Sequence, residues 1–184
     1  MSEVKKLRLR EDIPSSYKWN IEKIYKDSTQ WEEEFENLKG KSKSLLNFQG
    51  TLKDKENLKA YLSLDEDLSR TLEKLYVFAH MKSHEDTRIN KNQSNATKTD
   101  MLSTELSMAT SYMVPEIIAM DNEKLENYLK TEKLSHYKKY VDDILRLKPH
   151  TLNEREEELL AAVADLSGVP ENVYDMLSFA DLQF

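Results

Sequence analysis

The sequence predicts an all-α protein, an antiparallel bundle of long helices preceded by a short N-terminal arm. Three observations favour this class. The 184 residues include only three Gly and four Pro, too few for a turn-rich β fold. Residues 54–86 carry apolar side chains at intervals of three and four, with no Gly or Pro among them. Nowhere does a useful length of chain alternate between polar and apolar residues as a strand would.

Composition limits the classes of function. With 39% hydrophobic and 33% charged residues, the chain can bury a core beneath a heavily charged surface. The net charge of -7 argues against a nucleic-acid partner, because phosphate contacts need clustered Lys and Arg. We find no apolar run that could span a membrane and no signal peptide, so we expect no membrane partner. The absence of Cys excludes disulfides, thiolate metal sites and Cys nucleophiles.

We divide the chain into two parts. Residues 1–27 are an N-terminal arm and docking hook, in which four apolar residues are expected to dock on the main body, namely Trp19, Ile21, Ile24 and Tyr25. Residues 28–184 are a helical N-terminal domain. A helix through 28–45 opens this domain, with Asp27 among its possible N-caps and a possible break at Gly40.

The helix predicted over 54–86 is the element on which the others pack. Asp54 or Lys55 opens it, and at about 1.5 Å per residue it would run on the order of 45 Å. Acidic residues such as Asp65 are expected to face outward or flank the apolar stripe. A helix with one apolar stripe is not stable alone in water, so its neighbours must cover that stripe. The stripe comprises Leu58, Leu62, Leu68, Leu72, Leu75 and Ala79, widened by Tyr61, Leu64, Tyr76 and Phe78.

A second long helix is predicted over 89–118, where Pro115 either kinks it or begins a new short helix. Two shorter helices follow over 121–130 and 135–147, split near Thr131.

Capping boxes at 151–154 and 153–156 open the next helix, which runs through Leu159 and Leu166. The run S-G-V-P at 167–170 predicts a stop, followed by the restart of a last helix.

Candidate chemistry is sparse. The run H-E-D-T-R at 84–88 begins like H-E-x-x-H but places Arg88 where the second zinc-binding imidazole must stand, so it is rejected as a zinc site. His80 and His84 are spaced to share a helix face and could hold a metal together. The alternative is that both are solvated near a helix C-terminus. His136 is expected to be exposed and His150 to be structural.

No catalytic, cofactor-binding or metal-binding residue is assigned within these 184 residues. Acidic residues are too frequent for any carboxylate pair to be informative, and no Gly-rich phosphate loop or nucleophile signature occurs. Core packing is the preferred interpretation for the aromatic residues at core-like spacings, which are Trp19, Trp31, Tyr61, Tyr76 and Phe78.

Several segments in order resemble the N-terminal region of oligoendopeptidase F, of the thimet-oligopeptidase-like zinc metallopeptidases. No single segment is diagnostic, but together they cover essentially the whole chain. They are R-E-D-I-P at 10–14 with Y-K-W-N-I-E-K-I-Y at 17–25, F-Q-G-T-L at 48–52, L-Y-V-F-A at 75–79 with E-D-T at 85–87, R-L-K-P-H-T-L at 146–152 running into E-E-E-L-L at 156–160, and F-A-D-L-Q-F at 179–184.

This resemblance implies a cytoplasmic, mainly helical endopeptidase that cleaves short peptides inside an enclosed channel. In that family the zinc lies on an H-E-x-x-H helix, with a further Glu ligand, much later in the chain, so no ligand is carried over here. The chain is then expected to be the N-terminal lobe of a larger helical metallopeptidase, truncated before its catalytic domain. It would form part of the channel wall, with short peptides and its own catalytic domain as partners and zinc only in the complete enzyme. In isolation it would be inactive.

Two other functions stay open. The chain could be a freestanding helical module that binds a protein partner, with its long helices offering a groove. A natural stop codon after Phe184 would support the module, and an H-E-x-x-H further along the gene would support the enzyme. A metal-dependent activity through His80 and His84 ranks last.

Overall fold

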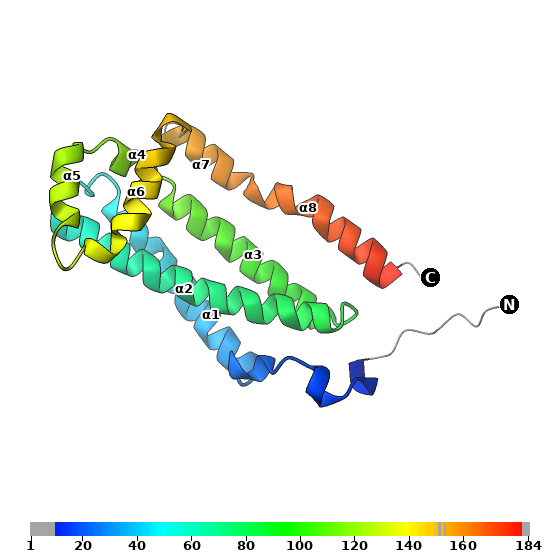
Figure 1. Ribbon diagram of the computed structural model, residues 1–184. Helices are drawn as coiled ribbons and strands as arrows, with labels where there is room; N and C mark the ends of the chain where they lie inside the picture. The colour runs from blue at the N-terminus through cyan, green and yellow to red at the C-terminus, as the bar shows by residue number, and fades with distance from the viewer. Residues whose placement is uncertain (1–9, 151, 153, 182–184) are drawn as a thin grey trace.

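The computed structural model describes residues 10–150, 152 and 154–181, and within these ranges every regular element is a helix (Figure 1). The all-α prediction is confirmed. The α-helices are α1 (Ser28–Ser42), α2 (Lys55–Glu85), α3 (Asn90–Thr110), α4 (Met113–Ile118), α5 (Asn122–Leu129), α6 (Lys138–Leu147), α7 (Glu154–Ala162) and α8 (Ala164–Asp175). No helix in the described part of the chain is long and apolar enough to cross a membrane.

Helix α2 lies at the centre of the bundle, as its apolar stripe predicts. Asp54 caps it, with its carboxylate accepting from the backbone N–H groups of Glu56 at 2.9 Å and Asn57 at 3.0 Å. Helices α1 and α3 pack along it, and α3 returns antiparallel to it (Figure 1). The side chains that α2 buries are Leu58, Tyr61, Leu62, Leu68, Leu75, Phe78, Ala79 and Ser83.

One residue of α2 lies otherwise than expected. Tyr76 is 41% exposed rather than in the core. Asp65 is half-buried, at the flank of the apolar stripe. Apolar periodicity locates the centre of a buried face, but the positions at its edges depend on which neighbours cover them.

The N-terminal hook docks only in part. Ile21 and Tyr25 are buried, and Tyr25 meets Phe78 edge-on with ring centroids 5.3 Å apart. Trp19 is 80% exposed, so its predicted docking is wrong. The hook consists of separate 3₁₀ turns, and the extended backbone at Lys18 interrupts them. A continuous apolar face therefore does not form.

Ion pairs fasten the hook to the last turns of α2. Lys82 donates to Glu22 at 2.7 Å and to Glu85 at 3.3 Å, and Arg10 pairs with Glu85. The first residues described thus lie against the far end of the central helix.

Two predicted breaks fall at other positions. Helix α1 continues through Gly40 to Ser42 and passes into a 3₁₀ segment, Lys43–Phe48. The second long helix ends at Thr110, and Pro115 is the third residue of α4. At that position a proline costs little, because the first N–H groups of a helix have no partner within it. The helices expected over 121–130 and 135–147 are present as α5 and α6, the latter after a 3₁₀ turn.

The C-terminal helices also divide elsewhere than predicted. The chain breaks at Val163, and α8 then runs through both Gly168 and Pro170, so the predicted stop at 167–170 is wrong. Pro170 cannot donate to the carbonyl of Leu166, but Leu166 is 65% exposed and water can reach that group. One π-helical turn, Met176–Asp181, continues α8. The predicted caps at Thr151 and Asn153 lie outside the described residues.

Candidate functional site

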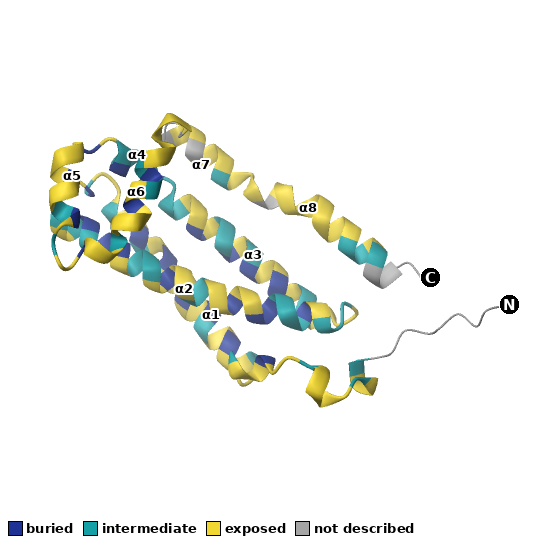
Figure 2. Ribbon diagram, in the orientation of Figure 1, coloured by how far each residue is buried: buried dark blue, intermediate teal, exposed yellow. Residues whose placement is uncertain are grey.

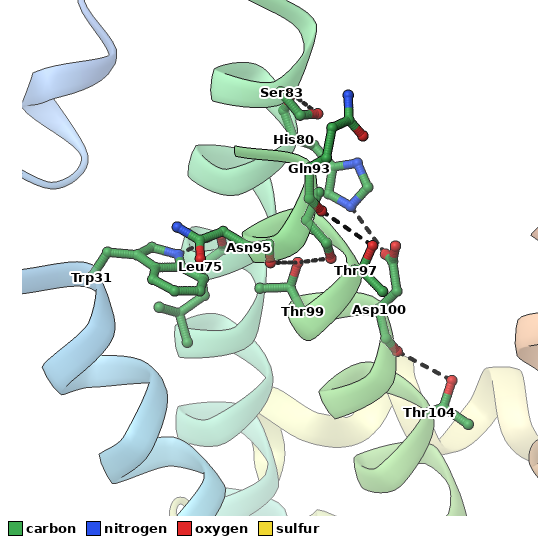
Figure 3. A network of polar contacts seen from close by, with 11 residues as sticks. Trp31, Leu75, His80, Ser83, Gln93, Asn95, Thr97, Thr99, Asp100 and Thr104 are labelled. Atoms are coloured by element: carbon green, nitrogen blue, oxygen red, sulfur yellow. Dashed lines mark hydrogen bonds and ion pairs between the residues drawn. The ribbon is translucent and has the colours of Figure 1, made fainter. Parts of the chain in front are cut away.

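A polar seam joins the second half of α2 to the first half of α3 (Figure 3). Thr99 is fully buried and donates to the carbonyl of Ala96 at 2.7 Å, while Asn95 is only 8% exposed. From α1, the indole Nε1 of Trp31 donates to the carbonyl of Leu75 at 3.0 Å. The polar half of α3 is therefore packed through its small side chains, which allow the two helices to approach closely.

In this seam, the side chain of His80 is held between a carboxylate and an aromatic ring. Its Nε2 lies 3.0 Å from Oδ1 of Asp100 on α3, and its ring stacks on Tyr76 with centroids 3.9 Å apart. The side chain is 23% exposed, so the expectation of a solvated His80 is wrong. A carboxylate held against an imidazole fixes the orientation of the ring, an arrangement suited to proton transfer or metal binding. Here it also ties α2 to α3.

Within the part of the chain that the structure describes, His80 and Asp100 are not joined by the further His, Asp or Glu side chains that a metal site needs. The ring of His84 meets that of His80 edge-on at 6.0 Å. Among the described residues, no three or more His, Asp and Glu side chains are gathered as metal ligands would be.

The H-E-D-T-R run lies where α2 ends. Helix α2 stops at Glu85, so Arg88 sits in the following turn, where its Nε donates to Asp86 at 2.8 Å. The Arg88 guanidinium holds the pKa of the Asp86 carboxyl down at about 2. This contact closes the corner between α2 and α3, and positions 84 and 88 do not share a helix.

The other histidines lie apart from this seam. His136 is 59% exposed, as expected, with its ring against Tyr137 and its Nε2 3.9 Å from Glu66. His150 is exposed at the end of a 3₁₀ turn, Lys148–His150.

A hollow at the start of α2 is lined by Lys55, Lys59 and Lys133, with Glu56 and Glu132 among them. The N-terminus of a long helix can bind an anion through its free N–H groups. In this helix Asp54 already accepts from two of those groups. The hollow is therefore not assigned as an anion site.

Exposed residues predominate along α7 and α8 (Figure 2). The exposed apolar residues of these helices, of the break between them and of the π turn that follows are here named the arm face. These helices lie along α3, yet none of their described residues is buried. Side chains of this size are normally covered when so many occur together. The arm face comprises Leu159, Leu160, Val163, Leu166, Val169, Val173, Tyr174 and Leu177, each between 49% and 65% exposed.

Sequence reasoning missed two acidic residues. The pairing of Asp100 with His80 depends on the register between two helices, which a single sequence does not reveal. Asp65 looks like any other acidic residue on α2, and its only signal is its place four residues after Tyr61 on the buried face.

The chain is similar in sequence to known oligopeptidases. A family model described as Oligopeptidase F matches residues 116–184. The chain is 32% identical to Oligopeptidase PepF of Bacillus subtilis, over 95% of its own length and 26% of that protein. It is 30% identical to Group B oligopeptidase PepB of Streptococcus agalactiae, over 95% of its own length and 30% of that protein.

Solved structures agree with this. The crystal structure of oligoendopeptidase-F from Enterococcus faecium superposes with a TM-score of 0.80 at 26% identity, covering 86% of this chain and 32% of that one. A putative peptidase from Chlamydophila abortus superposes with a TM-score of 0.71 at 25% identity, covering 97% of this chain and 31% of that one. The chain thus spans between about a quarter and a third of these relatives. Since it matches these relatives along nearly its whole length, the chain belongs to the oligoendopeptidase F family.

Proposed function

We propose that this chain is the N-terminal helical portion of a zinc-dependent oligoendopeptidase that hydrolyses short peptides. In that role it forms part of the wall of the substrate channel and has no peptidase activity by itself. One observation carries the proposal. The chain aligns with peptidases over 95% of its own length while covering only 26% to 30% of theirs. The greater part of each relative lies outside the match, and we assign the reacting groups to that part.

The described residues do not fit a zinc site. His80 is held by Asp100, and Arg88 stands where a second imidazole is needed, beyond the end of α2. No further His, Asp or Glu of the described chain completes a ligand set. We therefore place the zinc ligands outside this chain and derive no catalytic step from its residues.

The arm face supports the proposed role in a larger molecule. Helices α7 and α8 expose leucine and valine side chains along both helices, and they extend away from the α4–α6 end of the bundle (Figure 2). An apolar helical surface of this kind is stable in water when a further layer packs against it. We assign that layer to the catalytic portion of the same enzyme.

The first test is the metal content and peptidase activity of the purified 184-residue chain. We expect no stoichiometric zinc and no cleavage of a short quenched fluorescent peptide. Chelator-sensitive turnover would overturn the proposal. A double variant, His80→Ala with His84→Ala, traces the source of any such activity, because loss of turnover in that variant would assign the activity to these histidines.

The second test places the chain in an enzyme. In a chimera, this chain replaces the matching segment of Oligopeptidase PepF, and we expect the chimera to cleave the same peptide. Leu166→Asp with Val173→Asp is expected to abolish that activity while leaving the melting temperature of the isolated chain unchanged. Ser167→Asp with Asn172→Asp adds the same two negative charges at exposed polar positions of α8 and serves as the control. Full activity of the arm-face variant would contradict the assignment of the arm face as the packing surface.

A further inference from the structure

One half-buried carboxyl takes no part in the proposed function. Asp65 lies on the inner side of α2, one turn after Tyr61. Tyr61 is 0% exposed, and its hydroxyl has no hydrogen-bond partner in the described structure. No hydrogen bond or ion pair joins Asp65 to any described residue either. Residues four apart on a helix have Cβ atoms about 5–6 Å apart. The charge of Asp65 also acts on the Tyr61 hydroxyl, so two polar groups that each lack a partner among the described residues lie near one another.

The surroundings of Asp65 are aromatic and acidic. Its charge acts on Tyr61 of the same helix, on Tyr112 at the start of α4 and on Tyr140 of α6. Glu116 of α4 also acts on Tyr61 and Tyr112, but its carboxylate is already bound by the backbone N–H groups of Gly50 and Leu52. Burial raises the pKa of Asp65 to about 6. Among the described groups, no cation lowers the pKa of Asp65 against this effect of burial.

We propose that Asp65 and Tyr61 form a proton-operated latch where α2 meets α4 and α6. When Asp65 takes up a proton, its carboxyl group donates a hydrogen bond to the Tyr61 hydroxyl oxygen within α2. The negative charge beside Tyr112 and Tyr140 is then removed, so α4 and α6 pack more firmly against α2. When Asp65 loses that proton, an ionised carboxylate stands among aromatic rings and the joint weakens. The latch concerns this lobe alone and does not depend on the proposed peptidase role.

The direction of the pH dependence follows from linkage. The pKa of Asp65 lies above its ordinary value of 3.8 in the folded protein, so folding favours the protonated form. The stabilisation is therefore complete below about pH 4 and is lost as the pH rises through about 6.

The test compares Asp65→Asn with Asp67→Asn, the same change at an exposed position two residues along α2. Asn resembles the protonated carboxyl group. We expect Asp65→Asn to raise the melting temperature by about 2–4 °C at about pH 7.5, and this gain to disappear at about pH 5. We expect Asp67→Asn to shift the melting temperature equally at both values. A lower melting temperature for Asp65→Asn at about pH 7.5 would overturn the latch.

Two further measurements keep the proposal testable if Asp65→Asn fails to fold. The carboxyl ¹³C resonance of Asp65 in the unaltered chain is expected to titrate with a midpoint near 6. A midpoint below the ordinary value would show that Tyr61 donates to the ionised carboxylate, and the latch would then be wrong. Tyr61→Phe removes the acceptor. The increase in melting temperature that protonation of Asp65 gives on lowering the pH from about 7.5 to about 5 is therefore expected to shrink. If that increase is the same in Tyr61→Phe as in the unaltered chain, Tyr61 does not accept the hydrogen bond.

Discussion

The bundle of α1 to α6 and the arm of α7 and α8 are built from similar sequences but differ in burial. Leu68, Leu72 and Leu75 of α2 have the same spacing as Leu159, Val163 and Leu166 of the arm. In the bundle that spacing coincides with exclusion of water, and Leu75 is 0% exposed. In the arm the three corresponding side chains are each at least 50% exposed. Helical periodicity therefore specifies an apolar face, whereas its partner depends on the rest of the molecule.

The largest effect that sharpens this contrast is expected for Leu75→Ala. This side chain is fully enclosed, so its removal leaves a cavity that rigid neighbours fill only partly. We expect the free energy of unfolding to fall by about 2–5 kcal/mol. Urea denaturation followed by circular dichroism measures this value. A loss below about 1 kcal/mol would show that α2 is not the centre of the core.

A smaller loss is expected for Trp31→Phe. The ring of Trp31 stacks on Phe35 with centroids 5.2 Å apart, and its Nε1 donates to the carbonyl of Leu75. Phe loses this hydrogen bond and part of the buried ring, while the carbonyl of Leu75 keeps its helical donor within α2. A cost of about 1–3 kcal/mol is expected in the same denaturation experiment. If stability is unchanged, the α1–α2 contact is held by packing alone.

The cap of the central helix gives a loss of about 1 kcal/mol when Asp54 is replaced by Ala. Two backbone N–H groups then lose their acceptor, and the negative charge near the positive helix end is removed. Asp54→Asn is the matched control, because Asn also caps well and is expected to retain most of the stability. Equal losses for Ala and Asn would assign the effect to charge.

The smallest effect is expected for Leu166→Ala, the same substitution as in the first experiment but in the arm. Leu166 is 65% exposed, so little buried area is lost. The isolated chain is expected to change by no more than about 0.5 kcal/mol. A loss as large as that of Leu75→Ala would mean that the arm face is already covered in solution, and the contrast between the two regions would fail.

The central helix could be predicted because all local signals agree along it. Asp54 provides a cap, and an unbroken stripe continues to the last turn of α2. Local signals misled at Gly168 and Pro170, where an exposed helix tolerates both residues. Trp19 was misplaced because hydrophobicity alone does not show whether the backbone turns a side chain towards the core.

The candidate site was less predictable than the fold. His80 was singled out by its spacing from His84, but its partner is Asp100, twenty positions along the chain on another helix. The burial of Asp65 and Tyr61 could be predicted only with knowledge of which side of α2 the later helices cover. Both cases depend on helix register and burial, which are properties of the assembled bundle.

The ties between α2 and the chain before it also have a consequence for the order of folding. They form nested pairs, with Trp31 against Leu75 inside Glu22 against Lys82, and Arg10 against Glu85 outermost. Each doubling of a loop costs only about 0.6 kcal/mol, so once an inner pair has formed the next pair closes at little additional entropy. We expect the contacts between α2 and the preceding chain to form first near the connection that precedes α2 and then progressively farther from it. The N-terminal hook would then dock last during folding and detach first during unfolding.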